Sequence, residues 1–277
     1  MENTTKPIKS MDAEEAKAYI NQHKEGAFNL IDVRQPGEYE TQRIPGAKLI
    51  SLPELNERLN EIEPAKPTIV YCASGRRSLA ASQLMVGQGF GDVYNLVGGI
   101  KSWQGHGATG PPDFGLTSLT GDESPEEMLI LAYGLEHGLK MFYQAQADKN
   151  DDEELNRLLS NLADIEEAHK NKVFSMYLNL TKSDIGQDAF ESKTVSDMME
   201  GGFTPESFYE QNQDLLQTVE GVLDLAMMLE TQSLDLYLRF SQKIMDKQSQ
   251  KVLNEIADDE KTHLTALGRL MDAKVGY

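Results

Sequence analysis

An eight-residue stretch occurs twice in this sequence, and the repetition restricts the folds that the chain can adopt. Residues 162–169 and 256–263 lie 94 positions apart, and in each copy a glutamate precedes a histidine by three positions. On an α-helix, that spacing places both side chains on one face. Glu136 and Glu230 are also 94 positions apart, so the repeat extends over a whole helical hairpin. The sequence therefore contains an internal duplication of paired helices.

Four helical patterns in the second half of the chain each carry an apolar stripe that a carboxylate interrupts. The apolar residues recur at spacings of three and four, as the buried face of a helix requires. The interrupting residues are Glu136, Glu166 with His169, Glu230, and Glu260 with His263. Four buried glutamates are too costly to leave without partners, and bound metal ions would remove that cost. One Glu-x-x-His pattern is usually a solvated face, but two copies with two further glutamates indicate a metal site.

The geometry of the two hairpins supports this interpretation. In each hairpin, the position midway between the two glutamates lies in or beside a polar turn, at residue 151 in the first and residue 245 in the second. Antiparallel helices would therefore bring both glutamates of a hairpin to one level. The segment 180–212 between the hairpins is long and contains glycine and proline. We expect residues 125–277 to form an all-α four-helix bundle with one long crossover.

The order Glu, Glu-x-x-His, Glu, Glu-x-x-His resembles the rubrerythrin branch of the ferritin-like superfamily, over about residues 126–271. The resemblance implies that the six side chains named above hold two iron ions, with manganese as the other candidate, and that the site acts on peroxide or dioxygen. Ferritin-like bundles often pair, so we expect a homodimer.

This sequence departs from the rubrerythrin pattern in two ways. Rubrerythrins usually carry a further carboxylate three positions after the glutamate of the third helix, where this sequence has Ser233. They also commonly carry a four-cysteine iron site that delivers electrons, and a single cysteine cannot form that site. We therefore expect an external electron-donor protein.

The first part of the chain shows apolar, strand-like runs that alternate with helical stretches. The expected strands are 28–33, 47–52, 68–71 and 93–97, and the expected helices are 12–23, 55–62 and 78–88. Such alternation favours a mainly parallel sheet with helices on both faces. We expect residues 1–104 to form an α/β domain and residues 105–124, which are rich in glycine and proline, to form an interdomain linker.

Cys72 is the single cysteine of the sequence and directly follows the expected strand 68–71. Open α/β sheets bind ligands beyond the carboxyl ends of their strands. The loop after Cys72 leads into a helix, whose N–H groups and dipole favour a thiolate over a thiol. Arg76 and Arg77 reinforce this effect. From position alone, a buried cysteine that only fills space at a strand end is an equally good interpretation.

The segment Tyr-Cys-Ala-Ser-Gly-Arg-Arg-Ser at 71–78 resembles the active-site loop of rhodanese domains, and the resemblance covers nearly all of residues 8–104. The stretches Leu-Ile-Asp-Val-Arg at 30–34 and Ile-Pro-Gly-Ala at 44–47 are similar to the first half of such domains. One departure is Gln42-Arg43, where the family commonly has Gly-His, and we expect it to affect the rim of the site.

The rhodanese resemblance implies that Cys72 carries sulfane sulfur as a persulfide. It further implies that the Arg77 guanidinium supports the sulfur or an anionic donor electrostatically. The same ligand would be cradled by backbone amides of the loop residues Ala73, Ser74, Gly75, Arg76 and Arg77.

The net charge of −19 is distributed unevenly along the chain. Residues 1–106 contain 12 Lys+Arg and 13 Asp+Glu, which leaves 14 and 32 of the totals of 26 and 45. The acidity of the second part argues against nucleic acid or an anionic membrane as its partner. No apolar run approaches the ~20 residues of a membrane span, and residues 1–10 lack the apolar core of a signal peptide. We therefore expect a cytoplasmic protein.

Together these patterns predict a two-domain enzyme, in which a sulfurtransferase domain acts on small-molecule sulfur donors and acceptors beside a di-iron redox domain. One alternative is an iron-binding or storage module joined to a sulfur-relay or docking module. Another is a rhodanese domain that acts as a sensor, in which Cys72 is modified but transfers nothing.

Overall fold

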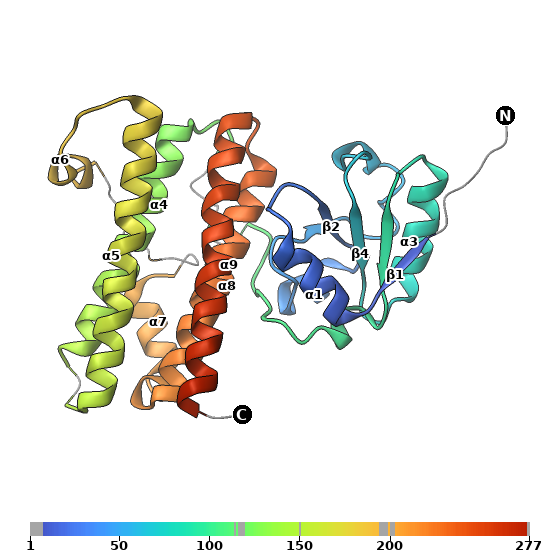
Figure 1. Cartoon of the computed structure of the whole chain (residues 1–277). Helices are drawn as coiled ribbons and strands as arrows, with labels where there is room; N and C mark the ends of the chain where they lie inside the picture. Colours follow the sequence, from blue (N-terminus) through green and yellow to red (C-terminus); the bar gives the residue numbers. More distant parts are fainter. Residues whose placement is uncertain are drawn as a thin grey trace. The chain divides into compact units, whose positions relative to one another are not determined.

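The computed structural model describes residues 8–113, 115, 120–149, 151–193, 199 and 203–275. The chain divides into two compact units, Met1–Phe114 and Gly115–Tyr277, whose elements are labelled in Figure 1. The division falls within the expected linker, 105–124. Outside the described residues lie 114 and 116–119 of this linker, and 194–198 and 200–202 of the expected crossover.

The first unit is built on a five-stranded sheet in which every neighbouring pair of strands is parallel. The order across the sheet is β1 (Lys9–Met11), β5 (Val93–Leu96), β4 (Thr68–Tyr71), β2 (Asn29–Asp32) and β3 (Lys48–Leu49). All four residues of the central strand β4 are buried, as expected for a parallel sheet with both faces covered. The predicted α/β class is confirmed.

Successive side chains of β4 enter two different cores, because strand side chains alternate between the faces of a sheet. Ile69 and Tyr71 belong to the core that also contains residues of α1 (Ala13–Gln22). Val70 and the next residue, Cys72, belong to the core that contains residues of α3 (Arg76–Gly87). The alternation therefore places the thiol on the α3 side of the sheet.

The short edge strand β1 and the helix α2 (Pro36–Thr41) were not predicted from the sequence. The helix has the start signals that proteins favour, with Pro36 at its first position and a capping box between Gln35 and Glu38. Its six residues are too few for a helical period to be recognised in the sequence.

The helix predicted at residues 55–62 is wrong. This stretch forms turns and a single 3₁₀ segment, Leu59–Glu61. Leu55 and Ile62 are buried, but the residues between them are exposed or half-buried. Two apolar anchors are too few to stabilise so short an α-helix.

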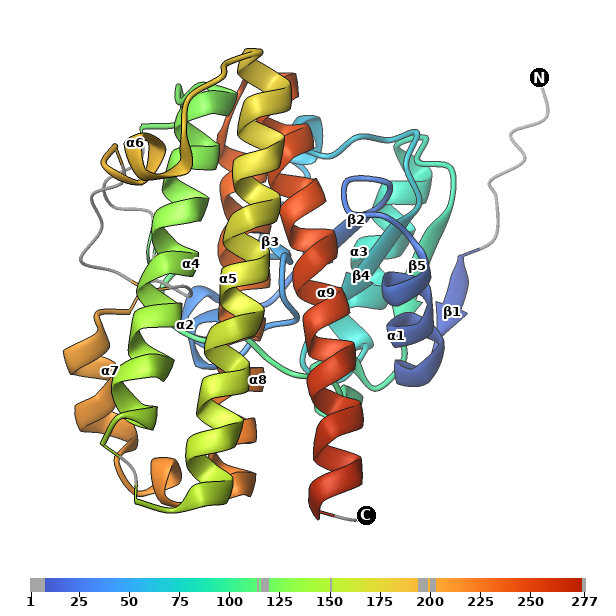
Figure 2. The ribbon, with the colours of Figure 1, turned by 60° about the vertical axis from the view of Figure 1, so that its left-hand side comes forward.

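The second unit is a bundle of four long helices, α4 (Pro125–Ala147), α5 (Glu153–Thr181), α8 (Val219–Lys243) and α9 (Lys247–Val275). Figure 2 shows α4, α5 and α9 running alongside one another. The closest pairs are α4 with α5 and α8 with α9. The segment between the pairs carries α6 (Gln187–Glu191), α7 (Pro205–Asn212) and a 3₁₀ turn at Leu215–Gln217. The predicted bundle of two hairpins is confirmed.

Capping residues set the starts of the first two long helices. The Ser124 hydroxyl accepts from the Glu127 N–H, and the Glu127 carboxylate accepts from the Ser124 N–H. The Asp152 carboxylate accepts from the N–H groups of Glu154 and Leu155. These contacts satisfy amide groups that have no partner inside the helix.

The apolar interior of the bundle is divided into two clusters along its length. Along α4, one cluster includes residues from Met128 to Leu135, and the other includes residues from Leu139 to Ala147. The other three long helices show the same division, and the interruption contains Glu166 on α5, Glu230 on α8 and Glu260 on α9. The bundle therefore holds a polar layer between two apolar ones.

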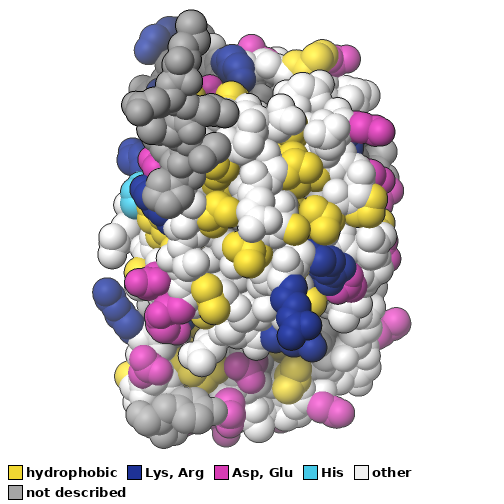
Figure 3. Space-filling model, turned by 90° about the vertical axis from the view of Figure 1, so that its right-hand side faces the viewer, with side chains coloured by type: hydrophobic (Ala, Val, Ile, Leu, Met, Phe, Trp, Pro, Cys, Tyr) yellow, Lys and Arg dark blue, Asp and Glu magenta, His cyan; other side chains and the backbone are white. Residues whose placement is uncertain are grey.

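Several charged side chains of the α/β unit form pairs of opposite sign. Lys9 pairs with Asp92 at 2.9 Å, and Arg58 pairs with Glu61 at 2.7 Å. Figure 3 shows one face of the molecule, on which acidic and basic side chains are interspersed with hydrophobic ones. Across the described part of the chain, no helix combines the length and apolar character that crossing a membrane requires.

Candidate functional site

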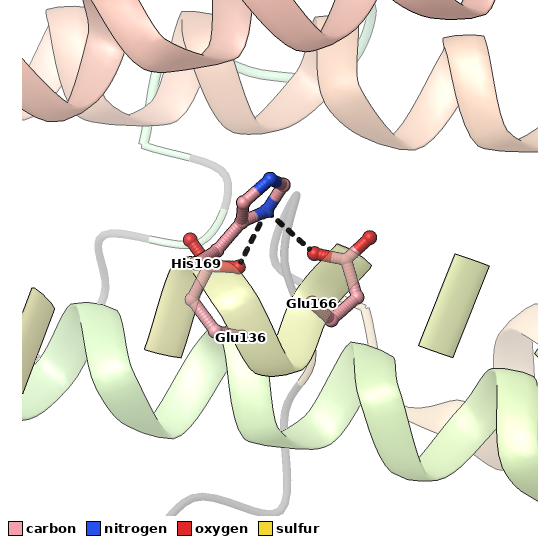
Figure 4. Close-up of side chains that lie close together, drawn as sticks. All are labelled: Glu136, Glu166 and His169. Atoms are coloured by element: carbon pink, nitrogen blue, oxygen red, sulfur yellow. Dashed lines mark hydrogen bonds and ion pairs between the residues drawn. The ribbon is translucent and has the colours of Figure 1, made fainter. Parts of the chain in front are cut away.

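The polar layer of the bundle contains two clusters of possible metal ligands, one in each hairpin. In the first, α4 contributes Glu136 and α5 contributes Glu166 and His169. Each of these residues offers one ligand atom, and the three atoms lie within 4.8 Å of one another. Figure 4 shows the three side chains converging from the two helices.

The distances within the first cluster are those of direct polar contacts. His169 Nδ1 lies 2.9 Å from Glu166 Oε2 and 3.4 Å from Glu136 Oε2, as the dashed lines in Figure 4 indicate. Glu166 and His169 share a face of α5 because three residues amount to nearly one helical turn. Glu136 reaches the same point because the hairpin sets α4 antiparallel to α5.

The second hairpin repeats this arrangement with Glu230 on α8 and Glu260 and His263 on α9. His263 Nδ1 lies 3.2 Å from Glu230 Oε2 and 3.2 Å from Glu260 Oε2. The two clusters adjoin, since the rings of His169 and His263 stack with their centroids 3.5 Å apart. The structure thus brings together all six side chains that the sequence analysis selected.

Burial makes these carboxylates electrostatically costly. Glu136, Glu166, Glu230 and Glu260 are each 3% exposed or less. Burial raises the pKa of Glu166, and the nearby Glu230 charge adds to that rise. Burial also acts to raise the pKa of Glu230, but hydrogen bonds with Glu260 and His263 outweigh it and lower this pKa. Opposite shifts are expected where close carboxylates share protons.

The donor set fits a pair of transition-metal ions. Four carboxylates and two imidazoles, held between apolar layers, are the ligands that iron and manganese take in dinuclear sites of helical bundles. Two divalent cations would also compensate the negative charge that burial makes unfavourable. The residues present therefore fit the predicted metal pair.

Four other residues of the bundle lie near these clusters. Tyr143 and Tyr237 are buried in the apolar clusters, one on each side of the polar layer, in line with a core role. His137 lies off the ligand face and pairs with Glu191 of α6 at 2.8 Å. Ser233 is buried, and its hydroxyl has no hydrogen-bond partner among the described residues.

A buried lysine beside the first cluster was not anticipated from the sequence. The Lys170 side chain is 3% exposed, and its Nζ lies 3.3 Å from Glu191 and 3.4 Å from Glu167. Its Nζ also lies 3.0 Å from His137 Nδ1. These contacts tie α6 to the outer face of the first hairpin. The burial of Lys170 could not be predicted from the sequence, because lysine side chains on helices normally lie in solvent.

The α/β unit holds the second candidate site, at Cys72. The thiol is buried at the end of β4, and its Sγ accepts from the Gly75 N–H at 3.1 Å. The Ser78 hydroxyl lies 3.5 Å from Sγ. Burial raises the pKa of Cys72, but hydrogen bonds from Ser78 and the loop amides outweigh it, so this pKa lies below the ordinary value. The loop favours the thiolate, as predicted.

Glycines allow the loop after Cys72 to take this shape. Gly75 is the N-cap residue of α3 and has φ = 88°. Residues other than glycine rarely adopt this left-handed backbone conformation. A Cβ on Gly99 would lie 2.2 Å from the Cys72 carbonyl oxygen. Among the side chains of the predicted cradle, Ala73 is half-buried, while Ser74 and Arg76 are exposed.

Arg77 has a partner that the sequence did not reveal. Its Nη1 and Nη2 donate to the two carboxylate oxygens of Glu38 at 2.8 and 2.7 Å. These hydrogen bonds lower the pKa of Glu38 to about 2. Glu38 sits in the first turn of α2, so the same capping box that starts this helix fixes the carboxylate beside the thiol loop.

Arg43, which belongs to the Gln42-Arg43 departure from the rhodanese pattern, binds the start of the expected linker. Its side chain is buried and donates to the carbonyls of Gly110 at 2.6 Å and Thr109 at 3.1 Å. The backbones of Arg43 and Ala108 form a reciprocal antiparallel bridge. Residues 108–110 therefore pack against the α/β unit.

Comparison with protein families assigns both units. The rubrerythrin model matches residues 127–271, which is 145 of 277 residues. The rhodanese-like domain model matches residues 12–106. The first match contains all six ligand candidates, and the second contains Cys72 with its loop.

Individual relatives match the α/β unit. The uncharacterized protein YqhL of Bacillus subtilis is 46% identical over 76 residues, which cover 27% of this chain and 60% of YqhL. The thiosulfate sulfurtransferase GlpE of Coxiella burnetii is 38% identical over 80 residues, covering 29% of this chain and 75% of GlpE. A rhodanese-like domain protein from Staphylococcus aureus has a solved structure with 29% identity, a TM-score of 0.33, and coverage of 35% of this chain and 91% of that one.

Proposed function

This chain belongs to the rubrerythrin family and carries a rhodanese-like domain ahead of its helical bundle, and on that premise we propose that it is a two-domain enzyme of sulfur transfer and metal-dependent redox chemistry. The rhodanese-like domain carries sulfane sulfur on Cys72. The bundle binds two iron ions, or manganese, and reduces peroxide or dioxygen.

The observation that carries the redox half is the meeting of two Glu, Glu, His clusters in one buried layer. Glu136, Glu166 and His169 would hold one ion, and the three residues of the second hairpin would hold the other. When bound, the metal pair supplies Lewis acidity and electrons for the reduction of an oxygen species. The chain itself fixes the ligands on rigid helices and excludes water with apolar layers on both sides.

The sulfur half is supported by the loop that follows Cys72. Its amides and the Ser78 hydroxyl favour the thiolate, which is the form of cysteine that attacks sulfur. The relative GlpE is named a thiosulfate sulfurtransferase. The sequence has one cysteine, so electrons for the metal site would come from an external donor protein. We further propose that the sulfur donors and acceptors are small molecules. The protein would act as a homodimer.

Metal analysis and kinetics test the redox half. Purified protein should contain two iron or manganese ions per chain, and Glu166→Ala should lose at least one. Glu167→Gln is a matched control, because Glu167 is the next residue and pairs with Lys140 outside the layer. Anaerobic iron loading followed by peroxide should give rapid, repeated reoxidation with an added reductant. Slow growth of a ferric mineral without turnover would support the storage alternative instead.

Sulfur transfer to cyanide tests the other half. Wild-type protein should convert cyanide to thiocyanate with a sulfane-sulfur donor, and Cys72→Ser should not. Transfer that persists in Cys72→Ser would contradict the assignment of this thiol. Modification of Cys72 without any transfer would favour the sensor alternative.

A further inference from the structure

Arg77, at the Cys72 loop, is paired with Glu38 and does not present an isolated positive charge. Both guanidinium nitrogens Nη1 and Nη2 of Arg77 are engaged by the two oxygens of Glu38. The side chains are about one-third exposed, at 34% for Arg77 and 37% for Glu38, so the pair lies at the protein surface. An arriving donor therefore meets a neutral pair where Arg77 alone would present a cation.

Glu38 is held in this position from two sides. Its Oε2 accepts from the Gln35 N–H at 3.1 Å as part of the capping box of α2, in addition to the bonds from Arg77. A carboxylate fixed by a helix start and a bidentate arginine has little freedom to leave. Its pKa of about 2 keeps it ionised at every physiological pH.

Arg77 also acts on the thiol. The hydrogen bonds to Glu38 are the main cause that raises the Arg77 pKa, and Cys72 contributes a smaller rise of the same sign. The negative charge of an ionised Cys72 therefore acts on the guanidinium in addition to that of Glu38. With an ionised Cys72, the three groups carry one positive and two negative charges. A doubly negative donor would add further repulsion.

We propose that Glu38 determines donor specificity, and that it directs Cys72 toward an organic hydropersulfide, R–S–SH, over the thiosulfate dianion. This inference rests on the proposed sulfur transfer at Cys72 and names its donor class. Removing the negative charge of Glu38 should favour sulfur donors in proportion to their own negative charge.

Both donors can convert Cys72 to its persulfide without an added oxidant or reductant. The Cys72 thiolate attacks the terminal sulfur of R–S–SH, the donor S–S bond breaks, and the electron pair leaves with RS⁻. The new S–S bond leaves Cys72–S–SH, with the proton retained on the transferred sulfur. With thiosulfate, the same attack releases sulfite, which takes the electron pair of the broken S–S bond.

Three donors separate a charge effect from a loss of structure. 2-Hydroxyethyl hydropersulfide, methanethiosulfonate and thiosulfate are compared at pH 5, where the hydropersulfide is largely uncharged, with cyanide as acceptor and kcat/KM as readout. Methanethiosulfonate carries one negative charge and thiosulfate carries two. Wild-type protein should prefer the hydropersulfide, and Glu38→Gln should raise kcat/KM for thiosulfate about tenfold and for methanethiosulfonate about threefold. The value for the hydropersulfide should change less than about twofold.

Glu61→Gln provides the matched control. Glu61 makes an equivalent two-oxygen pair with Arg58 in the same unit, and its pKa is also about 2. This variant should leave the ratio of the donors unchanged. If Glu38→Gln lowers kcat/KM for all three donors equally, or leaves their ratios unchanged, Glu38 has no role in specificity. If wild-type protein transfers sulfur from none of the donors, the proposed sulfurtransferase function fails along with this inference.

Discussion

The imidazole rings of His169 and His263 lie parallel, with an interplanar angle of 3° and centroids 3.5 Å apart. The two residues occupy equivalent positions in the two copies of the duplicated hairpin. Each Nδ1 faces the carboxylates of its own copy. The duplication therefore produces one shared polar layer. Its buried carboxylates would bind metal ions, but they lower the stability of the metal-free protein.

Glu166→Gln should have opposite effects on the metal-free and metal-loaded protein. Folding raises the pKa of Glu166, so its ionised form destabilises the native state at pH values above the unfolded pKa. At pH 7, the metal-free variant should be about 1–3 kcal/mol more stable than wild type. With metal, the order should reverse because a ligand is missing. Urea unfolding with chelator and with iron measures both values.

Glu167→Gln should not reproduce this reversal, since its carboxylate pairs with Lys140 outside the layer. A metal-free Glu166→Gln protein that is less stable than wild type would contradict the electrostatic account of the layer.

Glu38→Gln should weaken the α/β unit at neutral pH but not in strong acid. Hydrogen bonds from Arg77 lower the Glu38 pKa from 4.5 to about 2. A lowered carboxyl pKa stabilises the native state above pH 4.5, and the stabilisation is lost as the pH falls through about 2. Because the side chain is 37% exposed, solvent screening reduces the expected loss at pH 7 to roughly 1 kcal/mol. Urea unfolding of both proteins at pH 7 and pH 2 measures the difference, and an equal difference at both values would contradict this assignment.

The ligand layer could be predicted from the sequence because its information is local and repeated. Glu166 and His169 lie within one helical turn, and the copy 94 positions later removes the ambiguity of a single motif. The antiparallel hairpin then fixes the level of Glu136 from turn position alone. The strand before Cys72 was equally readable, since 68–71 is continuously apolar apart from Thr68.

The partners of Arg77 and Arg43 could not be predicted in the same way. Glu38 precedes Arg77 by 39 positions and belongs to a helix of six residues. Arg43 contacts carbonyl groups of Thr109 and Gly110, which leave no trace in the sequence because every residue has a carbonyl. Such contacts depend on the packing of distant segments and not on any local period.

Ser78→Ala should make Cys72 less reactive at neutral pH. The Ser78 hydroxyl is the foremost of the groups that lower the Cys72 pKa against the effect of burial. Its removal should move the alkylation profile toward higher pH, with a rate at pH 7 roughly two- to fivefold lower. Iodoacetamide kinetics between pH 5 and 10 measure the profile, and Ser82→Ala on the next turn of α3 is the control. An unchanged profile would show that the loop amides alone favour the thiolate.

Arg43→Ala should release the start of the linker from the α/β unit. The substitution removes the hydrogen bonds to Gly110 and Thr109 and the contact of the guanidinium with the Tyr39 ring, 4.6 Å from its centroid. Loss of a fully buried, hydrogen-bonded charge should lower the stability of this unit by about 2–4 kcal/mol. Residues near 109–113 should also become more sensitive to proteolysis under native conditions.

Limited proteolysis with mapped cleavage sites, together with urea unfolding, tests this expectation. Arg58→Ala is the matched control, because Arg58 is also paired but partly exposed, so its loss should cost at most about 1 kcal/mol. Cleavage near 109–113 should be unaffected in that variant. If Arg43→Ala unfolds at the wild-type urea concentration and is cleaved no faster, the backbone bridge between Arg43 and Ala108 alone holds the segment, and the buried guanidinium has another role.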